Sequence, residues 1–141
     1  MRLGATFLTF FVVSFVLSGL TASFVIVPLF YEGLGDTLRS AEDMSTFPSM
    51  IVGFALYSLA AAWLLLKARA ADGWLMNGLW VGIAFVIFIT GQYAILPGWS
   101  ILPVGPTIGS GFVSGLPAIP AAIAAAFVAH KLAGKSPVGA V

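Results

Sequence analysis

Long apolar runs, separated by short polar segments, dominate the pattern of this chain. The four runs extend from Ala5 to Phe30, Phe47 to Leu66, Trp74 to Leu96 and Gly105 to Lys131. Each has roughly 20 or more mostly apolar residues, which is the length that a helix needs to cross a hydrocarbon core of about 30 Å. The strands of a membrane barrel would instead alternate apolar and polar residues. The pattern therefore predicts an all-α integral membrane four-helix bundle, with residues 1–141 forming a single domain.

The positions of the charged residues predict how this bundle is oriented. Five of the six cations lie at the N-terminus, in the second loop or in the tail: Arg2, Lys67, Arg69, Lys131 and Lys135. With four helices, these three places share one side of the membrane. Cytoplasmic loops carry the excess of Lys and Arg, so we expect both termini to be cytoplasmic in a bacterial inner membrane.

Composition excludes several classes of function. Charged residues make up 8% of the chain, the net charge is +1 and there are no cysteines. Thiol chemistry is therefore absent, and no basic surface is available for nucleic acid. No Asp, Glu, Lys, Arg or His falls inside the hydrocarbon part of any predicted helix, although proton-coupled transporters need a titratable group near the middle of the membrane. His130, the only histidine, lies at a helix end, and no metal site or catalytic group of residues is expected. These observations indicate a protein that is not an enzyme.

Small residues are predicted to bring the helices close together. Gly78 and Gly82 form a GxxxG pair in the third run, and Gly111 and Gly115 form another in the fourth. Such pairs flatten a helix face for close contact. We expect these contacts both inside the chain and with another subunit. Pro117 and Pro120 lie near the centre of the fourth run, where each removes a backbone donor, so a kink is expected there.

A few polar and aromatic residues inside or beside the apolar runs are candidates for ligand binding. They are Ser18, Tyr57, Gln92, Tyr93 and Trp99. One interpretation is structural: hydroxyl groups bond across helix interfaces, and the buried amide of Gln92 finds a partner within the chain. The other is a site for the polar group of a bound quinone, lipid or pigment. The residue pattern leaves both interpretations open.

The turn from Pro97 to Pro103 carries no charge. Its apolar side chains include Trp99 and Ile101. A loop exposed to water would normally carry charged side chains, and apolar and aromatic residues dominate the core of protein interfaces. We therefore expect this turn to be buried, either among lipid head groups or against a partner subunit.

Three short motifs resemble a family of small four-helix bacterial membrane proteins of unknown function. They are "LFYEGLGDTL" at the end of the first run, "YAILPGW" at the end of the third and "GSGFVSGL" in the fourth. The residues that match include Phe30, Tyr31, Tyr93, Gly98 and Trp99. The resemblance implies the four-helix fold and no particular activity.

Two functions are compatible with this sequence. The first is a non-catalytic accessory or assembly subunit of a larger membrane complex, for example an energy-transducing one, because Asp, Glu, Lys, Arg and His are missing from the hydrocarbon part of the predicted helices. The second is a binder or carrier of a small apolar molecule, such as a quinone, lipid or pigment. This second function predicts a cavity of a few hundred Å³ between the helices, lined by Ser18, Tyr57, Gln92 and Tyr93.

Overall fold

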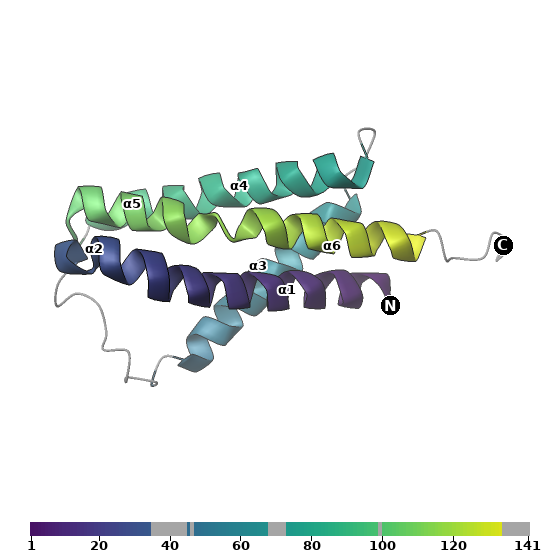
Figure 1. Ribbon diagram of the computed structural model, residues 1–141, viewed down its shortest axis with the longest axis horizontal. Coiled ribbons are helices and arrows are strands. Elements are labelled where there is room, and N and C mark those ends of the chain that lie inside the picture. Colours follow the sequence, from purple (N-terminus) through teal and green to yellow (C-terminus); the bar gives the residue numbers. More distant parts are fainter. Residues whose placement is uncertain (35–44, 46, 68–72, 99, 134–141) are drawn as a thin grey trace, which may run out of the picture.

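The computed structural model describes residues 1–34, 45, 47–67, 73–98 and 100–133, and this part of the chain contains helices and turns but no strand (Figure 1). The first rod joins α1 (Arg2–Thr21), a π-helical segment η1 (Ala22–Ile26) and α2 (Val27–Leu34). It is followed by α3 (Phe47–Lys67), α4 (Gly73–Ile95) with the short 3₁₀ segment η4 (Leu96–Gly98), α5 (Val104–Gly115) and α6 (Ala118–Ala133).

These elements form four helical rods that are long and apolar enough to cross a membrane. The rods are Arg2–Phe30, Phe47–Lys67, Gly73–Gly98 and Val104–Ala133. The prediction of four membrane-length helices is confirmed, with ends that differ from the expected ones by a few residues. The side of the membrane on which the termini lie stays a prediction.

The exterior of the bundle is apolar on all sides. Large side chains on different rods are exposed, including Phe24 at 75%, Trp80 at 62% and Ile87 at 68%. In water, so much exposed apolar surface would be unfavourable. The distribution fits helices that are surrounded by lipid, where an apolar exterior carries no such cost.

Three of the rods lie side by side, and α3 crosses them obliquely (Figure 1). The first turn of α1 and the last turn of α6 lie at the same end, because the Arg2 Nε donates a hydrogen bond to the Ala129 carbonyl over 3.0 Å. We call this the terminal end of the bundle. The opposite end, which contains η4 and the turn before α5, is called the turn end.

A close backbone contact joins α4 to α6 through small residues. A Cβ atom added at Gly82 would lie 2.6 Å from the Cα of Ile119, and one added at Gly78 would lie 2.7 Å from the Cα of Ile123. The facing side of α6 is a buried stripe of alanines at helical spacing, namely Ala118, Ala121, Ala122, Ala125, Ala126 and Ala129. Small residues on both helices let the two backbones approach, so that dispersion contacts between them can form.

A kink was expected at Pro117 and Pro120, and the structure instead has a break between α5 and α6 at this place. The two helices keep the same general direction across it (Figure 1). In a continuous helix the prolines at 117 and 120 would leave the carbonyls of Val113 and Leu116 without donors. Instead, the Leu116 N–H donates to Val113 over 3.3 Å and the Ile119 N–H donates to Leu116 over 3.1 Å. These bonds, each between residues three positions apart, satisfy both carbonyls inside an apolar protein.

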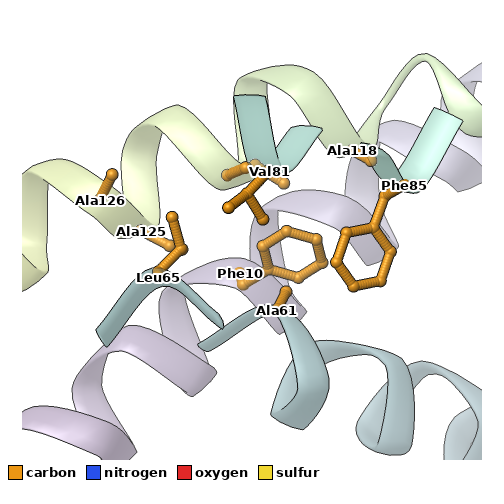
Figure 2. Packing of buried hydrophobic residues seen from close by; sticks show 10 residues of the cluster. Phe10, Ala61, Leu65, Val81, Phe85, Ala118, Ala125 and Ala126 are labelled. Carbon is orange, nitrogen blue, oxygen red and sulfur yellow. The ribbon is translucent and has the colours of Figure 1, made fainter. Parts of the chain in front are cut away.

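An aromatic cluster fills the centre of the bundle. Phe10 of α1 is 0% exposed, and its ring centroid lies 5.5 Å from that of Tyr57 and 5.8 Å from that of Phe85. The rings of Tyr57 and Phe85 meet edge to face with centroids 4.4 Å apart, a favourable aromatic geometry. Figure 2 shows Phe10 and Phe85 side by side, with Ala61 and Val81 packed around them. This cluster ties α3 to α1 and α4.

Candidate functional site

A cavity of about 720 Å³ lies between the rods, from the aromatic cluster toward the turn end. The first rod, α3, α4, α5 and the start of α6 all contribute to its wall. The lining residues are Ser14, Phe15, Ser18, Gly19, Ala22, Ile26, Met50, Gly53, Phe54, Tyr57, Ile89, Tyr93, Ser110, Ser114 and Ala118. Most of the wall is therefore apolar, with serine and tyrosine as its polar members.

Small side chains and the oblique path of α3 account for this space. On α3 the lining residues Met50, Gly53, Phe54 and Tyr57 recur at helical spacing, so they share one face. Gly53 lies in the middle of this face, and a Cβ added to it would meet nothing within 4 Å. The same holds for Gly19 on the opposite wall. Each wall thus has a glycine where a larger side chain would occupy the cavity.

Two kinds of hydroxyl group face this cavity. The first kind is already bonded to the backbone of its own helix: the Ser14 Oγ donates to Phe11 over 3.2 Å and the Ser110 Oγ to Thr107 over 2.9 Å. The second kind consists of the Ser18, Tyr57, Tyr93 and Ser114 hydroxyls, which form no hydrogen bond within the described part of the chain. A polar group without a partner in an apolar surrounding is unfavourable, so a ligand that bonds to these hydroxyls would be stabilised.

The backbone is irregular on two sides of the cavity. The π-helical segment η1 contributes Ala22 and Ile26 to the wall. The break between α5 and α6 lies directly beside Ser114 and Ala118. Short π-helical segments occur frequently at functional sites, and broken helices in membranes are tolerated where they are buried or line a cavity. Both backbone irregularities therefore mark the cavity as a candidate functional site.

Three of the five predicted ligand residues are brought together here. Ser18, Tyr57 and Tyr93 all line the cavity. Gln92 differs from the expectation: its side chain is exposed, is not part of the wall and forms no hydrogen bond within the described residues. The nearby Thr90 hydroxyl donates to the Val86 carbonyl over 2.8 Å. Trp99 lies outside the described residues.

The sequence analysis missed two hydroxyl residues of the wall, Ser110 and Ser114. They are four positions apart in the glycine-rich run, so they lie on the same face of α5. The four-residue spacing of these serines indicates a shared polar face, but the surrounding glycines favoured an interpretation in terms of helix packing.

The glycines predicted to contact a partner are placed inside the chain. Gly78 and Gly82 lie against α6, Gly115 lies against Val86, and a Cβ at Gly111 would overlap the Cβ of Tyr93. All four are buried, so these faces serve the internal contacts of the bundle. Among the residues predicted for partner contact that the structure describes, Ile101 is the one that remains available, with 93% of its surface exposed.

The cavity wall offers hydrogen bonds and apolar contact, but no carboxylate, imidazole or amine. Within the described residues no group of three His, Cys, Asp or Glu side chains could hold a metal ion. The arrangement is therefore suited to holding a molecule rather than to moving protons within it.

Comparisons of the whole chain with known proteins add no relative whose site could be set beside this one. No protein family, no curated protein and no solved structure was found to match it.

Proposed function

We propose that this protein binds a small, largely apolar molecule that carries a hydrogen-bonding group, such as a quinone, a lipid or a pigment. The observation that carries this proposal is the cavity of about 720 Å³ with the unbonded hydroxyls of Ser18, Tyr57, Tyr93 and Ser114 in its wall. Its volume is typical of small-molecule sites, which are mostly apolar with a few polar groups.

The mouth of the cavity supports a ligand that comes from the membrane. Gly19, Met50 and Gly53 line the cavity and are also exposed on the outside of the bundle. They lie on α1 and α3, so the cavity opens between these two rods. Since both rods are long enough to span a bilayer, this opening would face lipid. A molecule dissolved in the membrane would then enter sideways, without crossing water.

We place the protein in a bacterial inner membrane with both termini cytoplasmic. The four apolar rods support a membrane location. The excess of Lys and Arg at the terminal end supports the orientation.

The proposal is tested with two probes that differ in one polar group, tetradecanol and tetradecane. The melting temperature of the detergent-purified protein is measured against increasing amounts of each. We expect tetradecanol to raise it more than tetradecane does at the same concentration, because a bound ligand stabilises the folded state and only the alcohol can bond to the wall. Equal shifts with both probes would contradict the proposed polar recognition.

Tyr57→Phe is expected to weaken tetradecanol binding by roughly 2- to 10-fold, the net effect of one hydrogen bond of about 0.5–1.5 kcal/mol. Tetradecane binding should stay unchanged. The variant keeps the ring that packs against Phe10 and Phe85, so the protein without ligand should melt at nearly the same temperature. A loss that is equal for both probes would show that the hydroxyl is not the recognition group.

A second candidate function is an accessory subunit of a larger membrane complex, and the exposure of Ile101 favours it. This side chain lies in the chargeless turn and is 93% exposed. We expect Ile101→Lys to reduce the amount of any partner that co-purifies in mild detergent, and Ile101→Leu to leave it unchanged. A lysine resting among lipid head groups would be tolerated because its ammonium can reach water. Equal recovery with all three chains would therefore remove this candidate.

A further inference from the structure

A second cavity, at the terminal end of the bundle, is separate from the one described above. It has a volume of about 300 Å³ and lies where the first turn of α1, the last turns of α3 and α6 and the first turn of α4 converge. Its lining residues include Arg2, Trp74, Asn77 and His130, together with Leu65 and small residues of α6. Its wall therefore combines polar side chains, including the cationic Arg2, with apolar ones.

Two side chains of this cavity donate hydrogen bonds to carbonyls near helix C-termini, which would otherwise repel an anion. The carbonyls at a helix C-terminus carry partial negative charge. Arg2 Nε donates to the Ala129 carbonyl in α6 over 3.0 Å, and Asn77 Nδ2 donates to the Leu65 carbonyl in α3 over 3.1 Å. Each of these donors thus neutralises a carbonyl in the last turns of a helix.

The remaining donors of Arg2 are available for a ligand. Only the Nε atom of its guanidinium is engaged, and no carboxylate partner is found for Arg2 in the part of the chain that the structure describes. A guanidinium presents its donors in a planar fork that matches phosphate oxygens. The bond to Ala129 fixes the position of this fork at the cavity, so less entropy is lost when an anion binds.

The surroundings favour a membrane lipid over a dissolved anion. Trp74 packs edge to face on Phe127 with ring centroids 5.2 Å apart, and the Lys131 ammonium lies 5.4 Å from the centroid of the Phe127 ring. Tryptophan beside lysine is typical of the boundary between head groups and acyl chains. Leu75 and Phe127 are exposed next to the cavity, so acyl chains would find apolar surface beside a bound head group.

We propose that this terminal cavity binds the phosphate of an anionic membrane lipid, with Arg2 as the principal contact and acyl chains lying against the outside of α4 and α6. Basic pockets between membrane helices commonly bind such head groups. This inference does not rest on the function proposed for the larger cavity.

The test is native mass spectrometry of the full chain in detergent with phosphatidylglycerol and phosphatidylcholine of the same acyl chains. We expect the anionic lipid to bind roughly fivefold more than the zwitterionic one. Arg2→Gln should abolish this preference. Lys131→Gln removes the same charge at the same end but outside the cavity wall, and it should change the preference by less than about twofold.

Ala133→Phe provides a second variant that leaves every charge in place. Ala133 lines the cavity and is exposed, so a phenylalanine there should obstruct the site without disturbing the core. It should lower the preference for the anionic lipid as Arg2→Gln does. If Arg2→Gln fails to fold, Ala133→Phe serves as the test of the proposed site. Three results would overturn the proposal: no preference for the anionic lipid, equal losses in Arg2→Gln and Lys131→Gln, or inorganic phosphate that displaces the lipid at similar concentrations.

Discussion

Replacing Gly53 with leucine is expected to abolish the stabilisation by tetradecanol. Gly53 lies on the cavity face of α3, and a side chain at this position would meet no protein atom nearby. The leucine would therefore occupy the space that we assign to the ligand. We expect binding to weaken roughly tenfold or more, which corresponds to about 1.4 kcal/mol. The melting temperature with increasing tetradecanol measures this loss.

Gly91→Leu is the matched control for this variant. Gly91 is also exposed, and a Cβ added to it would also meet nothing within 4 Å, but it does not line the cavity. It introduces the same side chain into another membrane-length helix, so general effects on insertion and detergent binding are shared. Tetradecanol should stabilise Gly91→Leu as it stabilises the unmodified protein. Full stabilisation of Gly53→Leu would show that the probe binds elsewhere.

The second large effect is expected at the contact between α4 and α6. In Gly82→Ala the new methyl group would lie 2.6 Å from the Cα of Ile119, and backbone atoms of a helix cannot move aside singly. The two helices must separate, which disrupts the alanine stripe along their contact. Overpacking of this kind typically costs about 1–3 kcal/mol. A lower melting temperature of the ligand-free protein is the measurement.

Gly91→Ala provides the comparison within the same helix. Alanine favours a helix over glycine by up to about 1 kcal/mol, and at Gly91 nothing opposes this gain. This variant should be neutral or slightly stabilised. The two changes are chemically identical, so the difference between them isolates the close contact. If both variants melted at the same temperature, the tight approach of α4 to α6 would be contradicted.

The sequence predicted the rods of the fold because each depends on local composition. Continuous apolar runs define the spans, and Pro117 predicted a kink on steric grounds where the structure has the break between α5 and α6. The contact partners of the helices were harder to predict. Gly78 and Gly82 indicate a close approach, but they do not say which helix approaches, since many helix faces in an apolar protein are equally hydrophobic. The alanine stripe of α6 resolves this choice only once the packing is seen.

The convergence of residues at the cavity was also not predictable from local sequence patterns. Ser18, Tyr57 and Tyr93 were identified one by one as polar or aromatic residues inside apolar runs. Their convergence depends on the oblique path of α3, and no local pattern encodes that path. Gln92 directly precedes Tyr93 but projects about 100° away from it around the helix axis, the rotation per residue that 3.6 residues per turn imply. This rotation separates an exposed amide from a side chain that lines the cavity.

The cavity lies beside tightly packed helices. The backbones of α4 and α6 are in close contact through glycine and alanine, and the aromatic cluster of Phe10, Tyr57 and Phe85 helps to join α3 to α1 and α4. Beyond that cluster the rods enclose the cavity. A binding site supported on one side by tightly packed helices has a fixed wall against which a ligand can be oriented.

The most direct test of the proposed function is to identify what the protein carries when it is purified. The unmodified chain and Gly53→Leu are produced in the same host, purified in mild detergent and extracted with organic solvent, and the extracts are compared by mass spectrometry. We predict that one apolar compound with a hydrogen-bonding group is present in roughly equimolar amount in the unmodified protein and is depleted in Gly53→Leu. Extracts that contain the same compounds in the same amounts would contradict the account.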